Sequence, residues 1–79
     1  MRNREKVIDY MQREMSDGHG ETIMQIAYGA GLPYSTARDA LQTLEYRGVV
    51  QRGNLTDPNN DEKVIGKGWW LVEEEHAKN

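Results

Sequence analysis

Hydroxyl, guanidinium and amide side chains between residues 35 and 42 have the chemistry of a binding site. Ser35 and Thr36 carry hydroxyl groups that can hold a phosphate. Arg38 can bind guanine O6 and N7 through two parallel hydrogen bonds, and Gln42, one helical turn farther on, can read adenine. This part of the chain therefore suits the recognition of phosphates and polar base edges.

Catalysis and metal binding have no comparable support in the sequence. There is no Cys, and the two His residues stand far apart, at His19 in a glycine-containing loop and at His76. Neither a His-x-x-x-His pair nor a glycine-rich phosphate-binding motif is present, and the scattered carboxylates are typical of a solvated surface. We expect no enzymatic activity, no metal and no cofactor, and the lack of Cys fits a reducing cytoplasm.

Two helices are expected to lie before the polar segment. Apolar residues recur at near-helical spacing over residues 3–15 and predict a first helix with Asn3 as its N-cap. A second helix begins at Thr22, which forms with Gln25 the T-x-x-Q pattern of a capping box. Gly31 suits the left-handed position that closes this helix.

A third helix and two strands are expected to follow. Ser35 is the predicted N-cap of the third helix, which ends near Arg47. A strand is predicted from Val49 and a second one over residues 63–72, and a loop rich in turn residues over 54–61 joins them. The order of elements indicates an α+β domain of three helices and a β-hairpin.

The segment from Thr22 to Leu41 resembles the core of a helix-turn-helix. Ala27 is small where two helices approach, Gly31 follows four residues later where the turn needs a positive φ, and Leu32 is the apolar plug of the turn. Small residues then let the third helix sit tightly on the second, namely Ala37 and Ala40. With the hairpin as its wing, the domain is predicted to be a winged helix-turn-helix.

Residues 31–50, GLPYSTARDALQTLEYRGVV, are similar to the recognition-helix region of winged-helix repressors of the GntR type. Those repressors commonly read G-V-S-x-x-T-V-R-x-A-L-x-x-L-x-x-x-G followed by two apolar residues. The size of the chain is more like that of a small stand-alone regulator of phage, plasmid or archaeal type. The resemblance implies sequence-specific binding of double-stranded DNA by a regulator of transcription or replication. Its third helix would lie in the major groove, and a homodimer would read two half-sites.

The contacts implied by the resemblance fall on the third helix, the start of the second helix and the wing. They are Tyr34, Ser35, Thr36, Arg38, Gln42, Thr22, Gln25, Arg52, Lys63 and Lys67. Two of them have a structural alternative. Ser35 can serve as a helix cap, and Arg38 can pair with an acid, either near Asp39 or at Glu45.

Charge complicates the DNA prediction, because the formal net charge is −3. The domain is expected to span residues 1–72, which hold ten acidic and nine basic residues, and residues 73–79 to be an acidic, disordered tail. The expected wing tip carries three acids that would repel the minor groove, Asp57, Asp61 and Glu62. The alternative function is therefore a winged-helix module that binds a protein through the acidic wing or an exposed Trp.

Trp69 and Trp70 are neighbours in the second strand and should point to opposite faces, so one fills the core and the other is partly exposed. A short strand near Glu21 is expected to pair with the wing. The Trp pair also resembles that of small ferrous-iron-transport accessory proteins, but their wing cysteines are missing here. Apolar runs of only a few residues and a polar start predict neither a membrane partner nor a secretory signal.

Overall fold

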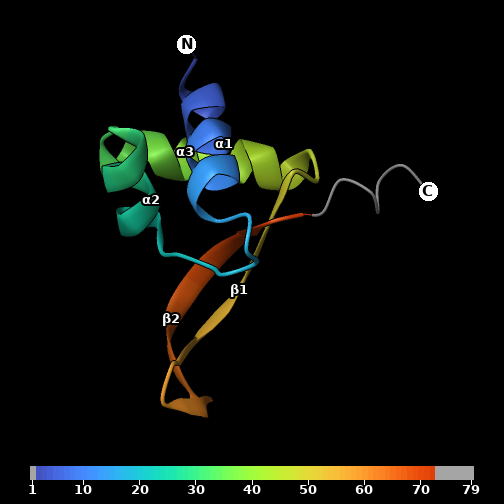
Figure 1. Cartoon of the computed structure of the whole chain (residues 1–79). Coiled ribbons are helices and arrows are strands. Elements are labelled where there is room, and N and C mark those ends of the chain that lie inside the picture. Colours follow the sequence, from blue (N-terminus) through green and yellow to red (C-terminus); the bar gives the residue numbers. More distant parts are fainter. Residues whose placement is uncertain (1, 73–79) are drawn as a thin grey trace, which may run out of the picture.

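The computed structural model describes residues 2–72, which form three helices followed by a two-stranded antiparallel hairpin (Figure 1). The elements are α1 (Asn3–Glu14), α2 (Ile23–Ala30), α3 (Tyr34–Tyr46), β1 (Val50–Asp57) and β2 (Asn60–Leu71). This order confirms the predicted winged helix-turn-helix fold. The expected acidic tail, residues 73–79, lies outside the described residues. None of the described helices is long and apolar enough to cross a bilayer.

The core lies between the three helices and the base of the hairpin. Its largest buried side chain is Trp69 of β2, which is 2% exposed. The other members of the buried cluster come from all three helices, the loop after α1 and β1: Val7, Met11, Met15, Ile26, Ala40, Leu41, Leu44 and Val50. Ala27 and Ala37 are buried as well, as expected for small residues where α2 and α3 approach closely.

The helix starts agree with the sequence prediction at α2 and differ at α1. At α2 the capping box is confirmed, because Thr22 Oγ1 accepts a hydrogen bond from the Gln25 N–H (3.1 Å) and Gln25 Oε1 accepts one from the Thr22 N–H (2.9 Å). Asn3 as N-cap of α1 is wrong, since the cap is Arg2. The Glu5 carboxylate accepts the Arg2 backbone N–H at 3.0 Å, which starts the helix one residue earlier.

The turn between α2 and α3 corrects one prediction and confirms another. Ser35 is not the N-cap of α3. The cap is Pro33, whose extended backbone (φ −61°, ψ 153°) leads into a helix that starts at Tyr34, and Ser35 lies in its first turn. Gly31 adopts the predicted left-handed conformation (φ 73°), and the Leu32 N–H donates to the Ala27 carbonyl at 2.9 Å.

The wing is longer than predicted and extends away from the helices (Figure 1). The expected loop over 54–61 is wrong, because β1 continues to Asp57, β2 begins at Asn60, and only residues 58–59 lie between them. Turn-forming residues are accommodated by register shifts on both sides of Thr56. The first strand begins at Val50 rather than at Val49.

Two expected features at the base of the wing are present. Glu21 forms an isolated antiparallel bridge with Trp69, in which each backbone N–H donates to the other carbonyl (3.2 and 2.9 Å). Trp70 points away from Trp69 and is half-buried. Its ring packs against Gly20, where an added Cβ would overlap it, and lies 3.2 Å from the Cβ position of Gly53. The second Trp therefore belongs to the joint between loop and wing.

Candidate nucleic-acid interface

Helix α3 presents an exposed polar face on the side opposite its buried residues. Ser35, Arg38 and Gln42 are exposed, and their spacing of three and four residues places them on one face. Tyr34, at the start of the helix, is 51% exposed. The structure thus brings these four predicted residues together. Two further exposed residues lie on the same face, Asp39 and Tyr46. Neither was predicted as a site residue, and their helical spacing from Ser35 was the available signal.

Among residues 2–72, Arg38 forms one ion pair. Its Nε lies 3.6 Å from Asp39 Oδ1, and the two side chains are 47% and 70% exposed. A pair this exposed contributes at most about 1 kcal/mol, so a stronger acceptor can replace Asp39. Of the two acidic partners expected for Arg38, the structure pairs it with Asp39. Glu45 pairs with Arg52 instead.

Arg52 joins the wing to α3. Its Nε lies 3.6 Å from Glu45 Oε2, and its guanidinium carbon lies 5.5 Å from the centroid of the Trp69 ring. This cation–π geometry over a buried ring suits a structural tie between β1, β2 and α3. The side chain is 51% exposed, so the tie leaves part of the guanidinium accessible.

The two lysines of the wing are dispersed. Lys67 Nζ donates to Asn54 Oδ1 across the strands at 3.0 Å. Lys63 is exposed near the tip, in the same strand as Asp61 and Glu62. The basic residues of the wing therefore do not form a single patch, and acids stand beside the outermost one.

Thr22 and Gln25 lie at the start of α2, where each side chain bonds the other's backbone. The remaining residue predicted on α3, Thr36, is half-buried on the flank that faces the start of α1. The side chains of Thr22 and Gln25 are thus engaged in the helix cap, and Thr36 lies beside the exposed face of α3 rather than on it.

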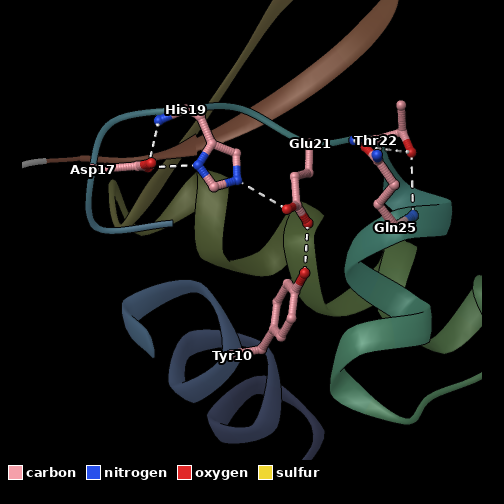
Figure 2. Close-up of polar contacts among 6 residues, drawn as sticks. All are labelled: Tyr10, Asp17, His19, Glu21, Thr22 and Gln25. Carbon is pink, nitrogen blue, oxygen red and sulfur yellow. Dashed lines mark hydrogen bonds and ion pairs between the residues drawn. The ribbon is translucent and has the colours of Figure 1, made fainter. Parts of the chain in front are cut away.

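A chain of polar contacts before α2 was not predicted from the sequence (Figure 2). The Tyr10 hydroxyl of α1 donates to Glu21 Oε1 at 2.7 Å, and Glu21 Oε2 lies 2.9 Å from His19 Nε2. Asp17 Oδ1 accepts the backbone N–H of His19 at 3.1 Å and also contacts its Nδ1. Asp17 and Glu21 flank His19 in the same loop, but Tyr10 comes from α1, so no local sequence pattern marks the whole chain of contacts.

These contacts shift the titration of three groups. Hydrogen bonds to Glu21 and Asp17 raise the pKa of His19, and the hydrogen bonds from the His19 backbone and ring lower the pKa of Asp17. Burial, with the bond to Glu21, raises the pKa of Tyr10 to about 12. Glu21 is also the residue whose backbone pairs with Trp69, so the cluster fixes where α1, the loop and the wing meet.

Comparisons with known proteins agree with this architecture. Residues 6–53, more than half of the chain, match the family model described as the IclR helix-turn-helix domain. The chain is similar to the PcaV transcriptional regulator from Streptomyces coelicolor, solved in complex with its natural ligand, with 18% identity and a TM-score of 0.65. It is also similar to a mutant of MepR from S. aureus, with 19% identity and a TM-score of 0.67.

The two structural matches cover 98% and 99% of this chain but 48% and 51% of those proteins, so the chain spans about half of their length. At these identities the matches support the winged-helix fold. No curated protein sequence matches the chain. The narrower resemblance to GntR-type repressors is not confirmed, since the matching family model is of the IclR type.

Proposed function

Because this chain belongs to the IclR helix-turn-helix domain family, we propose that it binds double-stranded DNA sequence-specifically, as a regulator of transcription or replication. The observation that carries the proposal is the exposed face of α3, where Ser35, Arg38 and Gln42 stand together on a helix held by the left-handed Gly31 turn. In this fold such a face enters the major groove.

Four residues of this face contact the DNA in this proposal. Arg38 leaves Asp39 and binds guanine O6 and N7, a contact that contributes about 1–3 kcal/mol of discrimination. Gln42 reads adenine one turn farther along the helix. Tyr34 and Ser35, in the first turn, donate to backbone phosphates near the positive end of the helix dipole.

In this proposal the wing makes few contacts with DNA. Asp57, Asp61 and Glu62 surround its tip and repel the phosphates beside the minor groove. Contacts are therefore left to Lys67, the accessible part of Arg52 and Lys63. Thr22 and Gln25 approach the DNA backbone from the start of α2. One α3 reads only a half-site, so we propose that the working unit is a homodimer on a palindrome.

The test is a fluorescence-anisotropy titration of a randomised duplex pool with wild type and Arg38→Ala, each at two salt concentrations. Arg13→Ala is the matched control, because it removes the same charge from the far end of α1. We expect salt-sensitive binding by wild type and by the control. On a sequence that wild type selects from the pool, we expect Arg38→Ala to bind about 5- to 150-fold more weakly. Equal binding by all three proteins would contradict recognition through α3.

A protein-binding wing is the second candidate function. The acidic tip stands next to two apolar side chains that are more than half exposed, Val64 at 54% and Ile65 at 57%. Trp70 does not add to this surface, since Gly20 and Gly53 pack against its ring. This candidate gains support if wild type does not bind duplex DNA even at low salt.

A further inference from the structure

An open polar groove runs between the start of α1 and one flank of α3. Its volume is about 410 Å³. Its polar lining comes from two segments more than thirty residues apart in sequence: Arg2, Asn3 and Arg4 of the first, and Thr36, Asp39 and Thr43 of the second. No local sequence pattern marks it, because neither segment forms it alone.

The groove and the wing lie on opposite flanks of α3. Thr36 and Thr43 are seven residues apart and share the flank that faces α1. Glu45, two residues beyond Thr43, points roughly 200° around the helix, to the flank where Arg52 of the wing pairs with it. A helix in a major groove has one phosphate backbone along each flank. The second backbone would therefore run along the α1 side.

The charges of the groove suit an anion. Arg2 is exposed and Arg4 half-buried, and neither forms an ion pair with another of the residues 2–72. Thr36 adds a hydroxyl, whereas the Thr43 hydroxyl donates to the Asp39 carbonyl at 3.1 Å. The one carboxylate of the lining, Asp39, lies beside Arg38. On the wing flank, by contrast, Arg52 is already paired.

We propose that this groove binds a backbone phosphate of double-stranded DNA, with Arg2 and Arg4 as its charged ligands and Thr36 as a neutral donor. The proposal rests on the proposed function and adds a second contact surface to it. With an acidic wing tip, the start of α1 becomes the main source of phosphate contacts beside α3. Binding then depends on residues that precede the helix-turn-helix motif.

The experiment compares the salt dependence of duplex binding for wild type, Arg2→Gln/Arg4→Gln, Arg2→Lys/Arg4→Lys and Arg13→Gln, by anisotropy on the sequence selected with wild type. The slope of log K against log salt falls by about 0.9 for each phosphate that the protein no longer neutralises. We expect that reduction, once or twice, in the double Gln variant and a slope near wild type in the double Lys variant. Arg13 pairs with Asp9 (3.5 Å) and lies roughly 16 Å from Arg2 along the helix axis, so Arg13→Gln should keep the wild-type slope.

The possible results distinguish failure of the groove proposal from failure of the proposed DNA binding. If the double Gln variant keeps the wild-type slope while Arg38→Ala still weakens binding, the groove proposal is overturned and the function stands. An equal reduction of slope in Arg13→Gln also overturns it, since net charge alone would then be responsible. If wild type binds no duplex at low salt, both proposals fail. Thermal melting by circular dichroism checks that each variant folds.

Discussion

Replacing Gly29 by Ala tests how tightly α1 is fitted to α2. In an exposed helix position this substitution normally stabilises a protein by about 1 kcal/mol, because Ala is the better helix former. Here the new Cβ would overlap Cε1 and Cζ of the Tyr10 ring and lie 2.7 Å from its Cδ1. The ring must move, and the Tyr10–Glu21 hydrogen bond (2.7 Å) moves with it.

Losing a hydrogen bond to a charged carboxylate costs about 1.5–3 kcal/mol, which outweighs the gain in helix propensity. We expect Gly29→Ala to destabilise the domain by about 0.5–2 kcal/mol, and each kcal/mol lowers the Tm of a domain of this size by about 4–8 °C. Urea unfolding and thermal melting measure both quantities.

A double-mutant cycle makes the reasoning refutable. In a Tyr10→Ala background the ring is gone, so Gly29→Ala should stabilise by about 1 kcal/mol, and the sign of its effect reverses. Tyr10→Phe is the matched control, since it keeps the ring and removes only the hydroxyl. If Gly29→Ala raises the Tm of the otherwise unchanged protein, the Tyr10 ring can move aside without loss of stability, and the fit between α1 and α2 is not tight.

Two further predictions concern the loop and the turn. His19 has a raised pKa in the folded protein, so its stabilisation is complete below its ordinary value of 6.5 and is lost as pH rises through the higher folded value. The Tm advantage of wild type over His19→Gln should therefore shrink as pH rises above about 6.5, and an advantage that grows would refute the assignment. Gly31→Ala should cost about 1 kcal/mol in urea unfolding, because φ is 73° and no atom lies within 4 Å of the added Cβ. Gly31→Asn should cost less, and equal costs would point to a cause other than backbone conformation.

The helices were predictable because their signals are local. The Thr22–Gln25 box and the left-handed Gly31 depend on residues within a few positions of each other, and both are present. The start of α1 moved by one residue and that of α3 by two, for reasons that side-chain statistics do not capture. Glu5 reaches the backbone of Arg2, and the conformation of Pro33 already leads into the helix.

The wing and the polar clusters were less predictable because some of their contacts join residues that are distant in sequence, such as Tyr10 and Glu21. Turn-forming residues between 54 and 61 favoured a loop, but cross-strand contacts such as Leu55 against Gly68 and Lys67 to Asn54 hold them in strands. The cluster of Tyr10, His19 and Glu21 depends on the packing of α1 against the loop. A sequence pattern could identify the candidate residues on α3 but not the partners of Arg52.

The net charge of −3 limits the kind of DNA binding that we propose for this chain. Several acids lie away from the exposed face of α3. Glu45 is paired with Arg52 on one flank of the helix, Glu21 bonds Tyr10 and His19, and the acids of the wing lie at the tip of the wing. The exposed face of α3 is therefore not opposed by these acids, and the cations near it include Arg38 on the face, Arg52 on one flank, and Arg2 and Arg4 on the other. Because non-specific affinity comes from phosphate contacts, and the acids of the wing tip oppose such contacts, we expect that component to be modest and salt-sensitive. In the proposed mode of binding, discrimination comes mainly from base contacts by Arg38 and Gln42, so we expect the ratio of specific to non-specific affinity to be high for a domain of this size.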